Sequence, residues 1–426
     1  MNNPHTIARA LLALAPFASA TAQGAAQKPI PVHKVVTLAS TDSGVIANTF
    51  VIRVLSDGRV LHNDAAKHRL LLLDTTLKHY EIIADTAGQA RKAFGAGQGG
   101  LLPYVGDSTI WIDTPSQALV VVDGIGHMGH IMAPLKSIDM VRFFSGSAYG
   151  APGFDVKGRL YYRAELPSGL PPIDFSVERP DSVAFLPDSA PIIRADFDTR
   201  RMDTVAMMRI PARKMILRRS ASGPRGFFTV FNPVPTTDEW AYLPDGTVAV
   251  VRGQDYHVDW FLPDGTRQST PKMPFDWRRI ADDDKRHLVD SMKTVFDSAY
   301  TRMLKQVDSI NAERKKQNLP NVGVGGRVLV VEPNEIPDYF PPVRQASQIR
   351  VDRDGNLWVI PSTSLAATTG AGNVFDVINR NGEIIERVQL PPGRNLHGFG
   401  PNGMIYMSVP PQAGWTRLER GRIIRD

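Results

Sequence analysis

A short unit of two strands joined by an Asp-Gly or Asn-Gly turn recurs along this chain, and it restricts the possible folds more than any other feature. The clearest example lies between Gln345 and Pro391. It contains four short segments rich in β-branched and aromatic residues, and Asp354-Gly355 and Asn381-Gly382 each separate two of them. Gly, Asn and Asp tolerate the positive φ angles that tight hairpin turns require. This stretch therefore predicts a four-stranded antiparallel sheet.

Similar units occur in the rest of the chain. Asp57-Gly58, Asp245-Gly246 and Asn402-Gly403 separate comparable pairs of strands. One such sheet cannot bury both of its faces, so it needs neighbours of the same kind. Four-stranded sheets packed radially form a β-propeller. The six copies predict an all-β chain, a six-bladed β-propeller of four-stranded antiparallel blades at about residues 47–85, 100–135, 150–211, 237–274, 345–391 and 395–426.

A β-sandwich is the structural alternative. It does not account for a recurring unit with an aromatic residue in its second strand, as at Trp111, Tyr161, Trp358 and Tyr406.

These units resemble those of NHL-type and TolB-like six-bladed propellers. The glycine-rich segment from Ala93 to Pro103 resembles the inter-blade linkers of secreted bacterial propeller proteins. The resemblance covers about residues 31–426 apart from the insertions. It implies a fold and no particular activity, because such propellers include hydrolases, lyases and binding scaffolds.

The N-terminal strand is expected to close the ring. Val32–Ala39 has the composition of a strand, whereas the last copy of the unit lacks a convincing fourth strand. Pairing of Val32–Ala39 with the strand near Arg422–Ile424 would remove the open edges of the first and last blades.

Residues 1–22 have the pattern of a secretory signal peptide. Arg9 precedes an apolar run, and Ala20-Thr21-Ala22 supplies the small residues that a signal peptidase requires. The run is too short for a membrane anchor, which needs about 20 residues. We expect residues 23–30 to form a flexible leader, residues 31–426 to form the propeller, and the protein to be exported to the periplasm or the extracellular space.

The largest insertion comprises residues 275–342, between the fourth and fifth predicted blades. Apolar residues three and four apart from Leu288 to Ile310 predict an amphipathic helix over 282–317. Asp282–Asp284 begin this helix and Arg314–Lys316 end it, as the helix dipole favours.

Three roles remain open for this helix: packing against the propeller, docking a partner, or covering the central channel with Phe296 and Met303 as apolar contacts. Two smaller segments are predicted as connections. Residues 165–190 are rich in proline and form a loop on one face, and residues 212–235 form a solvated connection or an anion-binding loop.

Composition excludes several classes of function. The chain has no cysteine, which excludes disulfides and thiolate chemistry. Its formal net charge of +6 is mild for 426 residues, and no dense lysine tract with interleaved aromatics occurs, so nucleic-acid binding is not predicted. After the signal segment, no stretch is long and apolar enough to span a membrane. The chain lacks the serine-elbow, zinc-helix and phosphate-loop motifs, and we predict no catalytic residues.

The candidate site follows from the geometry of a propeller. Innermost strands converge only at the axis, so only their ends can present several side chains to one molecule. The residues predicted to form a ligand-binding site at this channel mouth are Asn48, Gln98, Glu239, Gln345 and His397.

Two functions remain open at this point. The first is a binding scaffold, without a cofactor, for a small ligand or a protein partner. The second is a metal-dependent hydrolase or lactonase similar to the gluconolactonase and paraoxonase-like enzymes, in which the resemblance implies calcium at the channel mouth. The strand starts of this chain do not match the acid–asparagine–asparagine–acid ligand set of those enzymes. We expect a monomer.

Overall fold

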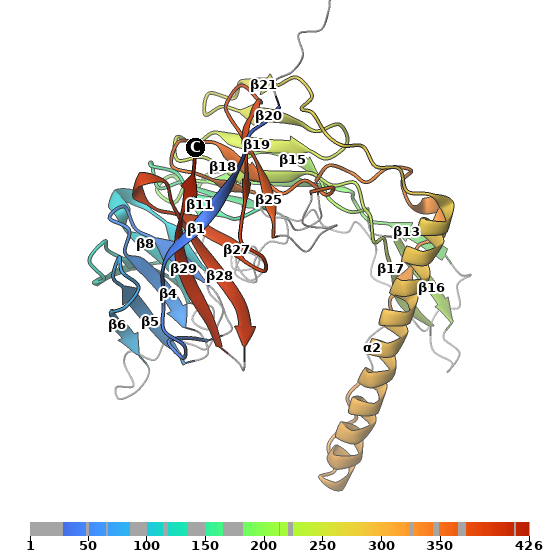
Figure 1. Cartoon of the computed structure of the whole chain (residues 1–426). Helices are drawn as coiled ribbons and strands as arrows, with labels where there is room; N and C mark the ends of the chain where they lie inside the picture. Colours follow the sequence, from blue (N-terminus) through green and yellow to red (C-terminus); the bar gives the residue numbers. More distant parts are fainter. Residues whose placement is uncertain are drawn as a thin grey trace, which may run out of the picture.

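The structure is a computed structural model, and β-strands dominate the part of the chain that it describes. A single α-helix, α2 (Asp282–Lys316), occurs in this part. Figure 1 shows most of the strands gathered in one body, with α2 and a small group of strands beside it projecting from this body. The described residues are 29–47, 51–64, 67–85, 100–113, 118–133, 150–164, 182–212, 214–219, 225–323, 327–343, 349–364, 372–412 and 415–425.

Four antiparallel sheets of four strands contain the copies of the unit from residue 52 to residue 269. The first contains β3 (Ile52–Val54), β4 (Val60–Asp64), β5 (Arg69–Leu73) and β6 (Tyr80–Asp85). The second contains β7 (Leu101–Pro103), β8 (Thr109–Asp113), β9 (Ala118–Val122) and β10 (Met128–Met132). The third contains β11 (Gly153–Phe154), β12 (Leu160–Arg163), β14 (Ser189–Ala195) and β15 (Met202–Arg209). The fourth contains β18 (Glu239–Tyr242), β19 (Val248–Arg252), β20 (His257–Phe261) and β21 (Arg267–Ser269).

The last two copies belong to one nine-stranded sheet. One antiparallel half contains β23 (Arg350–Val351), β24 (Leu357–Val359), β25 (Val374–Ile378) and β26 (Ile384–Gln389). The other half contains β27 (Asn395–Phe399), β28 (Met404–Gln412), β29 (Trp415–Ile424) and β1 (Val32–Ser40), and β2 (Ile46–Ala47) also pairs with β29. A short parallel pairing of β1 with β26 joins the two halves.

The predicted turns are confirmed. Gly58, Gly246, Gly355 and Gly403 each join the first two strands of a sheet, with φ angles of 89°, 90°, 82° and 68°. An aspartate stabilises several of these hairpins by capping backbone N–H groups. Asp352, for example, accepts hydrogen bonds at Oδ1 from the N–H groups of Asp354 (3.0 Å) and Asn356 (2.9 Å). The local sequence thus specifies the hairpin before any packing takes place.

Apolar clusters fill the space between each sheet and the next one along the chain. The aromatic residues predicted in the second strands are all buried in these clusters: Trp111, Tyr161, Trp358 and Tyr406. The cluster around Tyr406 also contains Val54 and Leu71, so the last copy packs against the first. Radial packing of four-stranded antiparallel sheets around such clusters is the architecture of a β-propeller.

The predicted pairing of the N-terminal strand is also confirmed. β1 runs antiparallel to β29, with Lys34 opposite Ile424 and Val36 opposite Arg422. Val35 lies in the cluster that contains Met407 and Ile423. The first strand of the chain therefore completes the sheet that ends the chain.

A further sheet corrects two sequence predictions. Parts of the segments predicted as connections, 165–190 and 212–235, form strands of a separate four-stranded sheet. We call it the arm sheet, and it contains β13 (Ser182–Phe185), β16 (Lys214–Arg219), β17 (Arg225–Phe231) and β22 (Leu329–Val330). These strands lack a clear alternation of apolar and polar residues, so the sequence did not indicate them.

The helix α2 packs on the arm sheet. The ring centroids of Phe296 and Phe231 lie 5.2 Å apart, and Leu288 and Met292 contact the cluster that contains Val230 and Val330. Figure 1 shows α2 beside β16 and β17, away from β18 and β27. Of the three roles left open for α2, covering the central channel is therefore excluded, because Phe296 contacts the arm sheet instead of the ends of the inner strands.

Both ends of α2 follow their local sequence. Lys285 Nζ lies 2.6 Å from Asp338 Oδ1 near the start. At the end, Asn318 adopts φ 55°, and the N–H of Leu319 donates to the carbonyl of Arg314 (2.9 Å), which is a Schellman motif. The helix ends at Lys316, one residue before the predicted end. No helix among the described residues is long and apolar enough to cross a membrane.

The closing strand yields the first prediction. Val35→Ala removes buried methyl groups between two sheets, and we expect it to lower the free energy of unfolding by about 1–3 kcal/mol. Val36→Ala, at a neighbouring position that is 42% exposed, is the matched control and should have little effect. Urea denaturation followed by tryptophan fluorescence measures both. Equal effects of the two substitutions would contradict the role assigned to β1.

The hairpin turns yield the second prediction. Gly355→Val places a β-branched residue at φ 82°, and we expect a loss of about 1–3 kcal/mol. The nearest atom to an added Cβ is Leu243 Cδ2 at 3.6 Å, so the loss would come from backbone strain and not from a clash. Gly355→Asn should be tolerated much better, because Asn adopts this conformation more readily. Thermal unfolding of the two variants would refute the argument if they were equally unstable.

Candidate functional site

The first strand of each sheet lies on the inner side of the body. β3 contacts both β7 and β27, β7 contacts β11, and β18 contacts β23. Strands that belong to different sheets thus meet at their inner edges. A side chain at the end of one of these strands is therefore close to the corresponding side chains of its neighbours.

Two of the five predicted site residues are described. Glu239 is the first residue of β18, and His397 lies in β27. Asn48, Gln98 and Gln345 lie outside the described residues.

Glu239 is fully buried, although the sequence predicted a residue at a solvated channel mouth. Its Oε2 accepts a hydrogen bond of 2.8 Å from the N–H of Gly150. Gly150 has φ 66°, and a Cβ added there would lie 2.3 Å from Nε1 of Trp240. Only glycine can bring its backbone so close to Trp240. This close approach lets the N–H of Gly150 hold the carboxylate of Glu239 in place.

Arg350 is a site residue that the sequence analysis missed. It lies in β23 between Ile349 and Val351, which both pack in the cluster shared with the fourth sheet. Burial lowers the pKa of Arg350, and the carboxylate of Glu239 opposes this effect. Arginine remains charged in proteins. A charged residue between two core residues of an inner strand was the available signal.

His397 completes the group. Burial, together with the charge of Arg350, lowers the pKa of His397 to about 3. Its Nε2 lies 2.8 Å from Oγ of Ser408 on the adjacent strand. A general base works best with a pKa near the operating pH, so this imidazole is a poor activator of a serine nucleophile. At neutral pH it presents an uncharged polar ring beside the Arg350 cation.

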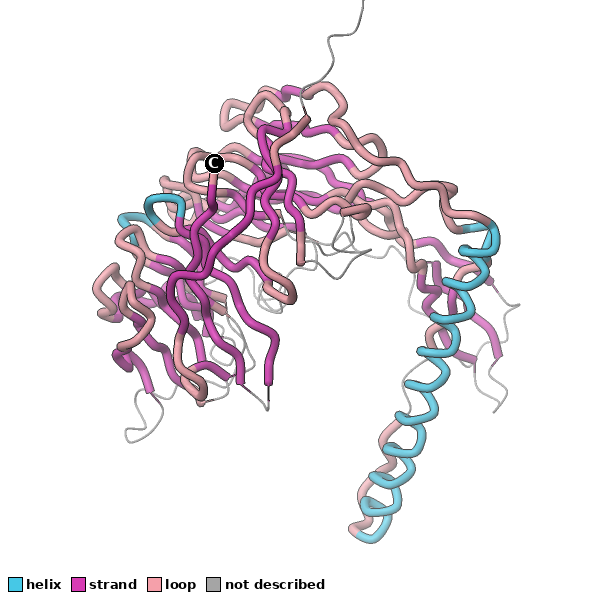
Figure 2. The backbone as a smooth tube through the Cα atoms, in the orientation of Figure 1, coloured by secondary structure: helices cyan, strands magenta, loops and turns pink. Residues whose placement is uncertain are grey.

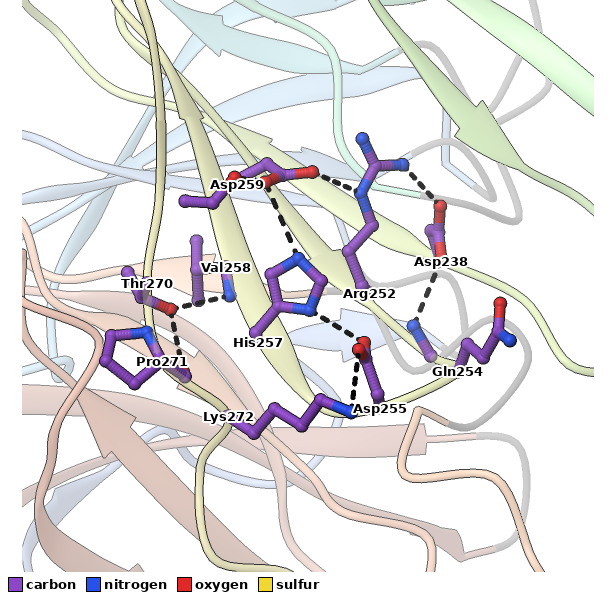
Figure 3. A network of polar contacts seen from close by, with 12 residues as sticks. Asp238, Arg252, Gln254, Asp255, His257, Val258, Asp259, Thr270, Pro271 and Lys272 are labelled. Atoms are coloured by element: carbon purple, nitrogen blue, oxygen red, sulfur yellow. Dashed lines mark hydrogen bonds and ion pairs between the residues drawn. The ribbon is translucent and has the colours of Figure 1, made fainter. Parts of the chain in front are cut away.

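A polar network anchors the start of β18, next to Glu239 (Figure 3). Asp238 accepts hydrogen bonds from the N–H of Gly253 (3.0 Å) and from Nη1 of Arg252 (2.7 Å). Arg252 Nε also donates to the buried Asp259 at 2.6 Å. His257 lies between Asp255 and Asp259, with nitrogen–oxygen distances of 2.7 and 3.5 Å. Lys272 pairs with Asp255 at 3.4 Å and Arg267 with Asp259 at 2.8 Å, so each of the three carboxylates has a cationic partner and the network has a structural role.

A second polar layer lies at the hairpin end of the inner strands. On β18 this layer lies at Tyr242, which follows Glu239 by three residues and is therefore about 10 Å further along the strand. Arg53 from β3 pairs with Asp107 at 3.2 Å, and burial lowers the pKa of Arg53. Arg353 donates to the carbonyl oxygens of Leu55 (2.9 Å) and Ser56 (3.3 Å) in another sheet. These contacts join the hairpins at this end of the inner strands, so the polar groups there have a structural role. The candidate site is therefore the layer of Glu239, Arg350 and His397.

Among the described residues, no group of three or more His, Asp or Glu side chains is placed to hold a metal ion. The candidate site combines one carboxylate, one guanidinium and one neutral imidazole. Its cationic group suits an anion better than it suits a cation.

Comparisons with known proteins identify no relative in sequence. No family model matches the chain, and no curated protein matches it. Similar solved structures include a streptogramin B lyase, with 9% identity over 92% of this chain and 97% of that chain and a TM-score of 0.38. A putative gluconolactonase has 12% identity over 92% and 94% of the two chains and a TM-score of 0.37. A PQQ-bound aldose sugar dehydrogenase from Streptomyces coelicolor has 12% identity over 92% and 98% and a TM-score of 0.38. At this level of similarity, no activity, metal or cofactor transfers to this chain.

The buried histidines yield the third prediction. Burial also lowers the pKa of His62, to about 4. In the unfolded chain both histidines titrate near 6.5, so between pH 6.5 and 4 the unfolded state binds more protons than the folded state. The free energy of unfolding should therefore fall with decreasing pH, by up to about 1.4 kcal/mol per pH unit for each histidine.

His397→Gln should remove the contribution of one histidine to the slope of the free energy of unfolding against pH. His127→Gln, at an exposed position, should leave this slope unchanged. Urea denaturation at several pH values between 4.5 and 7 measures the slope. An unchanged slope in His397→Gln would show that His397 is not a buried neutral group.

Proposed function

We propose that this protein is an exported six-bladed β-propeller that binds a small anionic ligand at the ends of β18, β23 and β27. It acts as a binding scaffold and not as a catalyst. The observation that carries this proposal is the position of Arg350, whose pKa responds to burial and to Glu239, and whose charge lowers the pKa of His397. Three inner strands thus contribute side chains that influence one another electrostatically.

The count of six blades rests on the clusters between sheets. Each of the six copies of the unit shares one apolar cluster with the copy before it and another with the copy after it. Export rests on the signal-like pattern of residues 1–22 in the sequence.

The anionic character of the ligand follows from the balance of charges in the site. Arg350 is half-buried, whereas Glu239 is fully buried and its Oε2 accepts a hydrogen bond from the N–H of Gly150. A guanidinium has five N–H donors and binds carboxylate or phosphate oxygens in pairs. The neutral imidazole of His397 adds no negative charge that would repel such a ligand.

The fourth prediction tests this site by thermal unfolding. The probes are acetate, succinate, citrate and inorganic phosphate, with acetamide and succinamide as uncharged counterparts. At least one anion should raise the melting temperature, because binding at 100 times the dissociation constant stabilises the folded state by about 2.7 kcal/mol. The amides should have no effect.

Arg350→Gln should abolish the shift. Arg201→Gln is the control, because it removes the same charge from a side chain that is 75% exposed, in the turn between β14 and β15. If no anion stabilises the protein, or if Arg350→Gln responds as the wild type does, the proposed site is wrong. If calcium raises the melting temperature and EDTA reverses this, the calcium-dependent hydrolase becomes the better account.

A further inference from the structure

The helix α2 leaves one of its faces uncovered. Its first half packs on the arm sheet through Leu288, Met292 and Phe296. Figure 2 shows the second half extending beyond the strands, with a loop running back beside it. This returning segment is fixed by Asn311, whose Oδ1 accepts a hydrogen bond of 2.7 Å from the N–H of Val322. The arm sheet and the returning segment cover one side of α2, and the opposite side faces solvent.

Part of the uncovered side carries little charge. Successive residues of an α-helix are rotated by 100° about its axis, so residues three and four apart lie on the same side. Residues at these spacings form a stripe along this side of α2. We call it the open stripe, and it contains Val295, Ala299, Arg302, Gln306 and Ile310. Val295 is 52% exposed and Ile310 is 40% exposed. Arg302 is the one charged member, and its long stem can cover apolar surface while the guanidinium reaches water.

The flank beside the open stripe is different in character. Asp290, Asp297, Lys305, Asp308 and Lys315 lie on this flank and are exposed. A long helix with one charged flank and one nearly uncharged stripe has the pattern of a helix that pairs with another helix.

The charges at the two ends of α2 are symmetric about Ala299. Asp282–Asp284 at the start and Arg314–Lys316 at the end lie equally far from Ala299 along the helix. The same relation holds for Val295 and Met303. An antiparallel second copy of α2, centred on Ala299, would thus place acidic residues beside basic ones at both ends. It would also place apolar residues beside apolar ones between the ends.

We propose that two copies of this chain associate through antiparallel pairing of the open stripe of α2, with a two-fold axis beside Ala299. A two-fold interface uses the same patch of both subunits, and α2 meets this requirement because its acidic start and its basic end are complementary to each other. Ala299 lies at the centre, where a small side chain lets the two backbones approach closely. The sequence analysis predicted a monomer, and this proposal replaces that expectation.

The charge pattern favours a second copy over an unrelated partner. The three acidic residues that start α2 favour a basic surface at one end, and the three basic residues that end it favour an acidic surface about 48 Å away. A second α2 in the antiparallel direction supplies both at the correct separation. It also opposes the two helix dipoles, which is favourable.

The fifth prediction concerns the oligomeric state, measured by analytical ultracentrifugation of the full chain without its signal segment. The wild type should be a dimer that dissociates as sodium chloride rises, because exposed charges are screened by salt. Ala299→Arg brings two cations together at the two-fold axis, and we expect association to weaken at least 100-fold. Ala312→Arg, on the charged flank of the same helix, is the matched control and should dimerise as the wild type does.

A charge exchange tests the direction of pairing. One variant carries Asp282→Lys and Asp284→Lys, and the other carries Lys315→Glu and Lys316→Glu. Each should self-associate weakly, whereas an equimolar mixture should form a heterodimer. Circular dichroism confirms that α2 is retained in each variant.

Three results would overturn the proposal: a wild type that is monomeric at concentrations up to about 100 µM, a dimer that survives Ala299→Arg, or variants whose mixture fails to associate. The first would leave the open stripe to a different partner protein. Ligand binding at Arg350 is measured separately, so failure of one proposal leaves the other intact.

Discussion

Burial of apolar side chains between facing sheets is the interaction on which the rest of this structure depends. Each four-stranded sheet shares one face with the preceding sheet and the other face with the following sheet. In the fourth sheet, Trp240 lies in the cluster with the third sheet, and the adjacent Ala241 lies in the cluster with the fifth copy of the unit. A linear series of such sheets would expose one apolar face at each end. The cluster of Tyr406 with Leu71 covers both of these faces, and β1 ties the two ends of the chain together.

The same packing determines the character of the candidate site. Side chains of the inner strands alternate between two apolar clusters, so a polar residue there is costly unless it finds a partner or reaches solvent near the axis. Glu239 meets this requirement through the N–H of Gly150, and His397 meets it by remaining neutral beside Ser408. Arg350 remains half-buried. The site is therefore organised around one cation whose neighbours are held in place by the fold.

The arm forms a packing unit of its own. The cluster under α2 contains Val289, Val230 and Val330, and it shares no residue with the clusters between the propeller sheets. Substitutions on the exposed side of α2 can therefore change association without disturbing the ring. This separation allows the two proposed properties, ligand binding at the inner strands and pairing through α2, to be tested independently.

The sequence by itself determined the elements that depend on local chemistry. Asp-Gly and Asn-Gly pairs specify hairpins because few residues adopt positive φ, so the turns at Gly58, Gly246 and Gly355 were predictable. The bounds of α2 followed from its apolar spacing and its terminal charges. The pairing of β1 with β29 was predictable as well, because a missing strand at one end of the chain matched a surplus strand at the other end.

Other features were decided only by the tertiary structure, because they depend on residues far apart in the chain. Strands β13, β16 and β17 lacked a clear pattern in the sequence. The fourth strand of their sheet, β22, is separated from them along the chain by the whole of α2. The site has the same origin. Glu239, Arg350 and His397 belong to three different copies of the unit, and the propeller geometry expected from the sequence indicated Glu239 and His397 but not Arg350. Their mutual effects on pKa arise because the inner strands converge, and long-range packing alone brings those strands together.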